Sequence, residues 1–265
     1  AASDVYKRQK DGRVVGVKAT MDGSEYTFNA KGGVVLATGG FGANPEMVKK
    51  YNPKIDERFK TTDAPGTTGE ALYMAERAGA QLVNMGYIQT YPICDPISGA
   101  IELIADARFD GAIMLNQEGK RFVNELETRD NVSAAELAQE GGYAYTILDQ
   151  KMMDASSTYN SYFTKGYAVQ ADSYEELAEK LGVDPATFAA TMETWNKAVA
   201  DQKDDEFGRL SFASALDTAP YYAIKVSPGI HHTMGGVKIN TNAEVLTEAC
   251  LLYTSPSPRD TERSR

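Results

Sequence analysis

The stretch from Val34 to Lys50 constrains the fold of this chain most strongly. Val34–Thr38 reads VVLAT, an apolar run bounded by glycines, which is typical of a strand buried on both faces. It leads into a Gly-Gly-Phe-Gly turn at 39–42, and Asn44-Pro45 then supplies an N-cap and a proline at the first helical position. A strand, a glycine-rich turn and a helix in this order predict an α/β (α+β) fold.

Shorter patterns predict the elements around this stretch. Asp22-Gly23 lies between the alternating segments 13–20 and 25–29 and predicts a β-hairpin, and Glu118-Gly119 predicts a second hairpin between 112–116 and 120–124. Helices are expected over 44–50 and 69–78, after the capping box of Ser173 and Glu176, and after Asp184-Pro185. The last of these helices has an apolar face that predicts core packing, made of Phe188, Met192, Trp195 and Val199.

The character of the sequence changes near residue 87 and changes back near residue 231. Tyrosine, proline, cysteine and aspartate crowd the segment 91–96, and helix patterns follow it until strand patterns return at 221–227 and 236–240. We therefore predict an insert that interrupts a strand-containing domain. The predicted parts are a tail at 1–11, a first domain part at 12–86, the insert at 87–230, a second domain part at 231–249 and a tail at 250–265.

Composition excludes several classes of function. The 265 residues are 42% hydrophobic and carry a net charge of −10, so a core is expected but binding to nucleic-acid phosphates or to an anionic membrane surface is not. No apolar run approaches the ~20 residues that a membrane-spanning helix needs. Cys94 and Cys250 lie far apart without a CxxC or histidine-rich motif, so neither a disulfide framework nor a metal site is expected.

Glycine and hydroxyl residues form the first candidate site. The turn that follows Thr38 begins with Gly39 and Gly40, whose backbone amides can approach an anion closely, at a place where open α/β sheets hold phosphates. Pro65–Glu70 (PGTTGE) offers hydroxyls and an acid at another helix start. Glu70 either accepts a hydrogen bond from a ribose hydroxyl or only complements the helix dipole, and the glycine turn is equally consistent with a plain turn.

Arginines and carboxylates form the second candidate site. Arg129 follows the motif GKRFVNE at 119–125, and Asp106 and Arg108 are expected upstream, on the other arm of the second hairpin. A guanidinium has a pKa above about 12 and can act as an acid only when neighbouring groups return its proton. The simpler hypothesis, which the sequence alone favours, is a ladder of surface salt bridges.

The third candidate site holds both histidines of the chain, His231 and His232, in the segment 228–236 (PGIHHTMGG). Adjacent side chains on an extended segment point to opposite faces, so the pair is not expected to chelate one metal. The Met-Gly-Gly that follows allows a flat ligand to approach the backbone. Two ordinary loop histidines remain the alternative.

Taken in order, the motifs ATGGF, TTGE, GKRFVNE with TRD, and HHTMGG resemble the flavoprotein subunit family of fumarate reductase and succinate dehydrogenase, in its soluble fumarate and urocanate reductase branch. The match covers about Gly12 to Leu246. This resemblance implies a Rossmann-like FAD-binding domain interrupted by an α+β capping domain. It also implies hydride transfer from reduced flavin to one carbon of an activated C=C bond and protonation of the other carbon by an arginine.

The resemblance assigns roles to individual residues. Arg129 corresponds to the proton-donating arginine, Arg108 to its relay arginine, and His231 to the histidine that holds a substrate carboxylate. The family usually has aspartate where Glu70 stands, which leaves that hydrogen bond an expectation. The implied FAD contacts are Thr38, Gly39, Gly40, Thr68, Gly69, Glu70 and His232.

Departures from the family pattern favour one substrate class. Fumarate reductases have a histidine where Tyr91 stands, two residues after Gln89, and a relay glutamate where Ala105 stands beside Asp106. A phenol and an aspartate bind an imidazole ring better than a second carboxylate. The resemblance is then to urocanate reductases, with Tyr91, Asp106 and Gln89 as substrate contacts and Asp106 as a second relay member.

The resemblance also implies missing parts. The family's GxGxxG segment and its second carboxylate-binding arginine have no counterpart here, so we expect an internal fragment that is inactive by itself, with an electron donor outside this chain. Compartment and oligomeric state stay open. The alternatives are a fumarate reductase proper, a ketosteroid-type flavin dehydrogenase and a non-catalytic interaction module.

Overall fold

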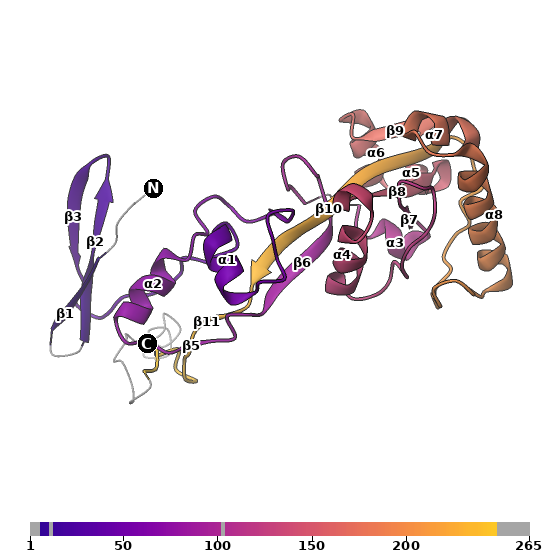
Figure 1. The fold of residues 1–265 in the computed structure, drawn as a ribbon. Coiled ribbons are helices and arrows are strands. Elements are labelled where there is room, and N and C mark those ends of the chain that lie inside the picture. The colour runs from indigo at the N-terminus through magenta and orange to yellow at the C-terminus, as the bar shows by residue number, and fades with distance from the viewer. Residues whose placement is uncertain (1–5, 11–12, 102–103, 248–265) are drawn as a thin grey trace, which may run out of the picture. The chain divides into compact units, whose positions relative to one another are not determined.

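The computed structural model describes residues 6–10, 13–101 and 104–247, and Figure 1 shows their helices and strands. The chain divides into two units, each described here by itself. The first contains the described residues up to Glu57, residues 63–89 and the described residues from His231 onward, and the second contains 58–62 and 90–230. The insert predicted at 87–230 lies close to the main segment of the second unit, 90–230. The roles of the two units, FAD binding and capping, stay predictions.

A three-stranded antiparallel sheet begins the first unit. Met21 pairs with Ser24, so Asp22 and Gly23 form the two-residue turn, and their φ angles are 51° and 76°. Two consecutive positive φ angles are what a tight hairpin requires, and the predicted hairpin is confirmed. The strands, in sheet order, are β1 (Tyr6–Lys10), β2 (Arg13–Met21) and β3 (Ser24–Asn29).

The expected buried strand at 34–38 is wrong. These residues have no regular secondary structure, and Val35 and Leu36 are 62% and 38% exposed. A buried strand needs neighbours paired along its edges, and no strand in the described part of the chain pairs with this run. An apolar run by itself therefore specified neither the strand nor its burial here.

The two helices predicted in the first unit are confirmed as α1 (Pro45–Tyr51) and α2 (Glu70–Arg77). The Asn44 side chain caps α1 by accepting a hydrogen bond of 3.0 Å from the backbone amide of Met47. Phe41, Met47 and Val48 are buried and form part of the local core. A short antiparallel pair completes this unit, with β5 (Leu82–Val83) against β11 (Gly236–Val237), which is shorter than the strand predicted at 236–240.

A six-stranded mixed sheet organises the second unit, and the long strand β10 lies at its centre (Figure 1). β10 pairs in parallel with β4 through Gly229 and Ile230, and antiparallel with β8 and β9 through its first residues. It extends beyond the predicted 221–227 and ends at Thr233, so it carries both histidines. The strands are β4 (Lys60–Thr61), β6 (Ile88–Cys94), β7 (Ile113–Leu115), β8 (Ala144–Asp149), β9 (Ala168–Ala171) and β10 (Tyr221–Thr233).

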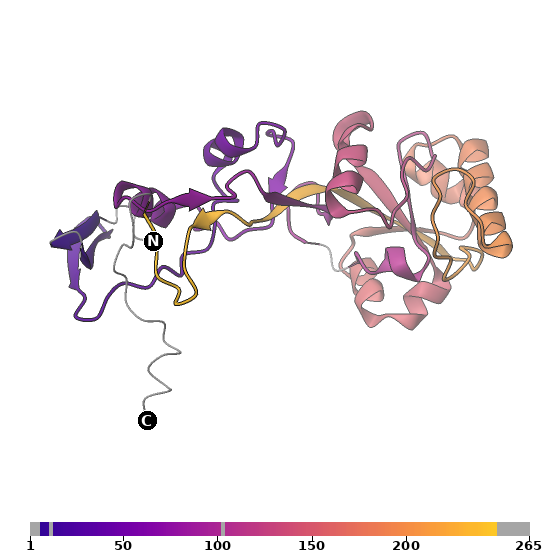
Figure 2. The same cartoon turned by 90° about the horizontal axis from the view of Figure 1, so that it is seen from below.

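Helices cover this sheet and bury a single large core. The predicted apolar face of the last helix is confirmed, because Phe188, Met192 and Trp195 are fully buried, and Figure 2 shows α8 lying against α7. Ser173 caps α7 as predicted, at 3.1 Å from the amide of Glu176. The helices are α3 (Ala107–Asp110), α4 (Arg129–Leu137), the 3-10 helix η1 (Glu140–Gly142), α5 (Gln150–Ala155), α6 (Ser157–Thr164), α7 (Tyr174–Leu181) and α8 (Pro185–Asp201).

Among the described residues, no helix has both the length and the apolar composition to cross a bilayer. In the same ranges no three side chains of the metal-ligating types converge on one point. Cys94 is buried, and its thiol donates to the carbonyl of Tyr91 at 3.5 Å, while Cys250 lies outside the described residues.

Candidate functional site

Four side chains predicted to act on substrate come from three elements of the second unit. Tyr91 lies in the middle of β6, Arg108 on α3 and Arg129 at the first position of α4, while Asp106 directly precedes α3. We call these four residues the arginine cluster. Asp106 and Arg108 were expected on a hairpin arm, and this is wrong, because residues 107–110 close a helical turn that ends at Gly111 with a φ of 120°.

Arg129 and Tyr91 are in direct contact. The guanidinium carbon of Arg129 lies 4.9 Å from the centre of the Tyr91 ring, which is within the range of a cation–π interaction. Tyr91 is 7% exposed, and its burial raises the pKa of the phenol, although the charges of Arg108 and Arg129 oppose the shift and that of Asp106 adds to it. Tyr91 therefore stays protonated at neutral pH and keeps an O–H to donate.

Arg108 is buried, at 4% exposed. Its Nε donates to the carbonyl of Ala105 at 3.1 Å, and its Nη1 donates to the carbonyl of Glu125 at 2.9 Å. Burial is the main reason that the pKa of Arg108 is lowered, and the charge of Arg129 lowers it further, against Tyr91 and the carboxylates of Glu125 and Glu136. Arg108 therefore releases a proton more easily than an exposed arginine does.

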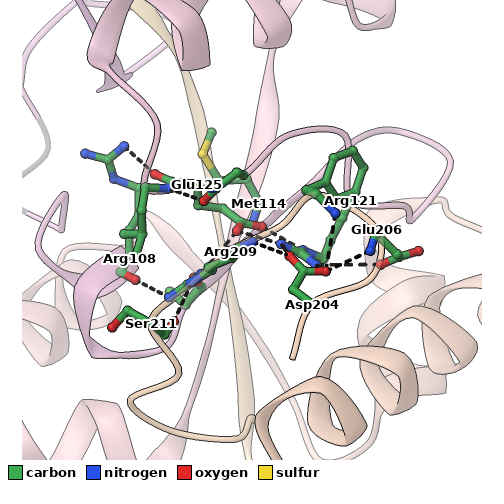
Figure 3. Close-up of polar contacts among 12 residues, drawn as sticks. Arg108, Met114, Arg121, Glu125, Asp204, Glu206, Arg209 and Ser211 are labelled. Carbon is green, nitrogen blue, oxygen red and sulfur yellow. Dashed lines mark hydrogen bonds and ion pairs between the residues drawn. The ribbon is translucent and has the colours of Figure 1, made fainter. Parts of the chain in front are cut away.

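The salt bridges that Arg121 and Glu125 of the GKRFVNE motif make with each other and with Asp204 and Arg209 are buried, which overturns the simpler hypothesis of a surface ladder for these residues. Arg121 donates through Nε and Nη2 to both oxygens of Glu125, at 2.9 Å each, and through Nη1 and Nη2 to Asp204, at 3.1 and 3.0 Å. Arg209 donates to Glu125 at 3.1 Å. Figure 3 shows these residues meeting, from the segments 121–125 and 204–209. We call Arg121, Glu125, Asp204 and Arg209 the buried network.

The buried network is balanced in charge and packed against one aromatic ring. It contains two arginines and two carboxylates, and all four side chains are at most 1% exposed. The guanidinium carbons of Arg209 and Arg121 lie 4.6 and 4.9 Å from the Trp195 ring. Burial raises the pKa of Asp204, but hydrogen bonds from Arg121 and from backbone amides outweigh it, so that pKa is lowered. Asp204 therefore stays ionised beside Arg121.

The sequence interpretation missed Asp204 and Arg209, and also Glu136, a fully buried glutamate of α4. Asp204 and Arg209 lie 83 and 84 positions from Arg121 and Glu125 respectively. Their local sequence, KDDEFGR, has the pattern of an exposed charged run. No local spacing signal identifies such a pair, because its members meet only in the folded chain.

The predicted cofactor residues of the first unit lie around the turn at Gly39 and Gly40. The backbone amide of Phe41 donates to the hydroxyl of Thr233 at 3.2 Å, which places the glycine turn beside the HHTMGG segment. A Cβ on Gly40 would lie 1.8 Å from that hydroxyl oxygen, and Gly39 has a φ of 72°. Both positions therefore require glycine, and Thr38 and Gly39 are exposed.

The TTGE segment lies beside the same turn. The amide of Ala43 donates to the carbonyl of Thr67 at 3.0 Å, and the Asn44 side chain donates to the carbonyl of Thr68 at 2.9 Å. Gly69 has a φ of 79°, and a Cβ there would lie 2.5 Å from the sulfur of Met47. Glu70 begins α2 and is exposed. The structure thus gathers Thr38, Gly39, Gly40, Thr68, Gly69 and Glu70 around one turn, which we call the glycine cradle.

The two histidines lie closer together than predicted. Their ring centres are 5.2 Å apart and the ring planes meet at 77°. Side chains that point to opposite faces of a flat strand cannot make this contact, so the rings turn toward each other at the end of β10. His231 is half-buried and His232 is exposed.

Asp63, which the sequence interpretation did not single out, faces both histidines. Burial raises the pKa of the Asp63 carboxyl, while His231, His232 and the backbone amide of Gly42 oppose that shift. Asp63 and both histidines belong to the first unit, as does the half-buried Gln89 of β6, whereas the arginine cluster belongs to the second. The predicted site residues are thus gathered in two groups, one in each unit.

Comparison with known proteins gives a consistent set of relatives. Residues 2–252 match the model of the family described as FAD binding domain. The chain is 44% identical over 234 residues to an NADH:fumarate oxidoreductase of Klebsiella pneumoniae, a match that covers 88% of this chain and 25% of the relative. It is 41% identical over 254 residues to a urocanate reductase of Eggerthella lenta, with 92% and 42% covered.

Among solved structures, the open conformation of a flavocytochrome c3 fumarate reductase superposes with a TM-score of 0.78 at 35% identity, covering 95% of this chain and 44% of that one. This superposition confirms the predicted α/β (α+β) fold class. The chain spans less than half the length of each of these three relatives.

Proposed function

Because this chain belongs to the FAD binding domain family, we propose that it forms part of an FAD-dependent reductase that saturates the C=C bond of an unsaturated carboxylate. The family membership confirms the resemblance found in the motifs and indicates FAD as the cofactor. One observation carries the proposed reaction, namely the contact of Arg129 with Tyr91 beside the buried Arg108. Such a protonation needs a positioned acid and a neighbouring group that returns its proton, and Arg129 and Arg108 supply these two groups.

The glycine cradle fits a flavin nucleotide. Its exposed turn presents the backbone amides of glycines, which have no side chains of their own. The Thr233 hydroxyl occupies the position that a Cβ on residue 40 would need, so this residue has to be glycine. Thr38, Gly39, Gly40, Thr68 and Gly69 would hold FAD through the backbone and hydroxyl groups. Glu70 and His232 are the polar side chains proposed beside them.

When bound, FAD supplies the hydride that adds to one carbon of the double bond. His231 binds the substrate carboxylate. Arg129 holds a proton on its guanidinium and delivers it to the other carbon, so that the double bond gains one hydride and one proton. Arg108 then returns a proton to Arg129, helped by the burial that lowers its own pKa. Asp106, exposed at the start of α3, is proposed as a substrate contact and as the next relay member.

The substrate we propose is urocanate, or a similar unsaturated acid with an aromatic ring, in preference to fumarate. Tyr91 supports this preference, because a protonated phenol with a raised pKa donates to a ring nitrogen but brings no positive charge for a second carboxylate. Gln89 and Asp106 are the other proposed ring contacts. A fumarate reductase proper is the alternative that the same experiment tests.

The activity measurements use the full-length protein of which this chain forms part, loaded with FAD. In a dye-linked assay we expect urocanate to reoxidise its reduced flavin at least about tenfold faster than fumarate, a difference of ~1.4 kcal/mol in the transition state. Tyr91→His should move the preference toward fumarate, because an imidazolium pairs with a second carboxylate. Tyr87→His is the matched control, since Tyr87 is 63% exposed in the first unit and should leave the preference unchanged. A wild-type preference for fumarate would remove the urocanate proposal, and a protein that binds no flavin would favour the interaction module.

Gly40→Ala tests the glycine cradle. The new Cβ would lie 1.8 Å from the hydroxyl oxygen of Thr233, so the turn must move, and we expect FAD to bind at least about tenfold more weakly. Gly66→Ala is the matched control in the same unit, because nothing lies within 4 Å of a Cβ there. A flavin titration measures the affinity of both variants for FAD. Equal affinities of Gly40→Ala and Gly66→Ala would exclude a cofactor role for this turn.

A further inference from the structure

We propose that Arg209 is a positioning residue that holds Arg108 in place for proton delivery to Arg129. This inference rests on the proposed function, which gives Arg108 its role in the relay. It concerns a residue that lies 101 positions along the chain from Arg108 and that no motif identifies.

Helix α3 has only four residues, Ala107–Asp110, and so short a helix has little stability of its own. Its last carbonyl groups have no partner within the helix. Arg209 donates through Nη2 to the carbonyl of Arg108 itself and through Nη1 to the carbonyl of Ala112, at 2.9 Å. A cation at the C-terminal end of a helix satisfies both its carbonyls and its dipole. Arg209 therefore fixes the backbone on either side of Gly111.

Glu125 links Arg209 to the other end of Arg108. The carboxylate of Glu125 accepts from Arg209 Nη1 at 3.1 Å, and the backbone carbonyl of the same residue accepts from Arg108 Nη1 at 2.9 Å. Figure 3 shows Arg209 between Glu125 and Arg108. The backbone of Arg108 and its guanidinium are thus both held by one connected set of contacts.

The geometry requires an arginine at position 209. Its guanidinium donates to four acceptors, which are the carbonyls of Ser211, Ala112 and Arg108 and the carboxylate of Glu125. A lysine keeps the charge but places at most three donors around one nitrogen, so it cannot span these acceptors. A positive charge at position 209 is enough to stabilise the network, whereas the planar guanidinium also holds the position of α3 through its hydrogen bonds to the carbonyls of Arg108 and Ala112.

Arg121 provides the comparison that separates positioning from stability. It is as deeply buried as Arg209 and shares Glu125 with it. Its hydrogen bonds go to Glu125 and Asp204, and none of them goes to a carbonyl of α3. Arg209→Lys and Arg121→Lys therefore make the same chemical change in one network, but only the first releases α3.

The experiment compares these two variants of the FAD-loaded protein by amide hydrogen exchange and by steady-state kinetics with urocanate. In Arg209→Lys we expect the amides of Phe109 and Ala112, which bond to Asp106 and Ala107, to exchange at least about tenfold faster than in wild type. We expect kcat to fall about 100-fold, as for a small misplacement of a reacting group. KM should change less than about threefold, and the solvent deuterium isotope effect on kcat should rise because proton delivery becomes slower. Arg121→Lys should leave both amides and the isotope effect as in wild type.

Equal exchange rates at Phe109 and Ala112 in the two variants would overturn the inference, as would an equal loss of kcat. If the wild-type protein reduces no unsaturated acid, the proposed function fails, and the exchange rates alone still decide whether Arg209 positions Arg108. If Arg209→Lys does not fold, exchange of the wild-type protein in rising urea replaces it. The amides of Arg209 and Ala112 should then open together, and separate openings would refute the link.

Discussion

Arg129→Ala will abolish turnover while FAD stays bound. We expect kcat to fall by at least about 1,000-fold, because a general acid contributes roughly 100- to 10,000-fold and alanine leaves no guanidinium against the Tyr91 ring at this position. FAD binding should be unchanged, since the glycine cradle belongs to the first unit and Arg129 to the second. Steady-state kinetics with a flavin titration on the same sample measures both quantities.

Arg77→Ala is the control for this prediction. Arg77 is an exposed arginine in the last turn of α2, and its removal should change turnover by less than about threefold. An Arg129→Ala protein that keeps activity within tenfold of wild type would exclude Arg129 as the acid. If the variant loses both activity and flavin, the protein has lost its fold, and Arg129→Lys, which keeps the charge, replaces it. Arg129→Lys should bind FAD and lose turnover, and wild-type turnover in this variant would exclude Arg129 as the acid.

Glu125→Ala should be the most destabilising substitution in the second unit. It removes the carboxylate that Arg121 and Arg209 share, at 2.9 and 3.1 Å, together with its contact to the amide of Met114 at 3.3 Å. The two buried guanidiniums are then left with the buried Asp204 and with the half-exposed Glu206, which lies 3.6 Å from Arg121. Breaking a buried ion pair in this way costs about 3–5 kcal/mol. Urea unfolding followed by the fluorescence of Trp195, the single tryptophan of the chain, measures the change, because this ring lies against both guanidiniums.

Glu118→Ala is the matched control, because Glu118 lies seven positions before Glu125, directly in front of the same motif. Its ion pair with Lys120 is exposed, with side chains 68% and 57% accessible, and such pairs add little to stability. The unfolding midpoint of Glu118→Ala should stay at the wild-type value. If Glu125→Ala also unfolds at the wild-type midpoint, the buried network does not hold this unit together.

Elements with a strong local signal were predicted well. The hairpin around Asp22-Gly23 and the helices capped by Asn44, Ser173 and Asp184 are all confirmed. Each of these signals acts through neighbours a few residues away, because a turn needs two particular φ angles and a cap needs one side chain beside the first amides. For these elements, the neighbouring residues were sufficient to predict the secondary structure.

Elements whose state depends on distant partners were predicted less well. The apolar run at Val35 and Leu36 has the composition of a buried strand, yet it is exposed, because a strand is buried only by what pairs with it and packs on it. The charged residues Arg121 and Glu125 have the pattern of a surface ladder, yet they are buried. In both cases the deciding contacts come from other parts of the chain.

The candidate site divides in the same way. Motif order in the sequence was enough to identify the FAD family and to single out Arg129, Arg108, Tyr91 and the glycine turn, because the chemistry resides in residue types at fixed short spacings. The structure added how Arg108 is held and which groups lower its pKa. Arg209 had no local signal, since three of its four acceptors lie 84 to 101 positions away in the chain.

By itself, the sequence determined the local elements, the family and the residues proposed for chemistry, since each depends on neighbouring residues or on the order of short motifs. Only the tertiary structure decided which charges are buried, how the arginines are supported and whether an apolar run is covered. These properties depend on solvent exclusion by residues far away in the chain, and solvent exclusion is what changes both the energy of a charge and the pKa of a side chain.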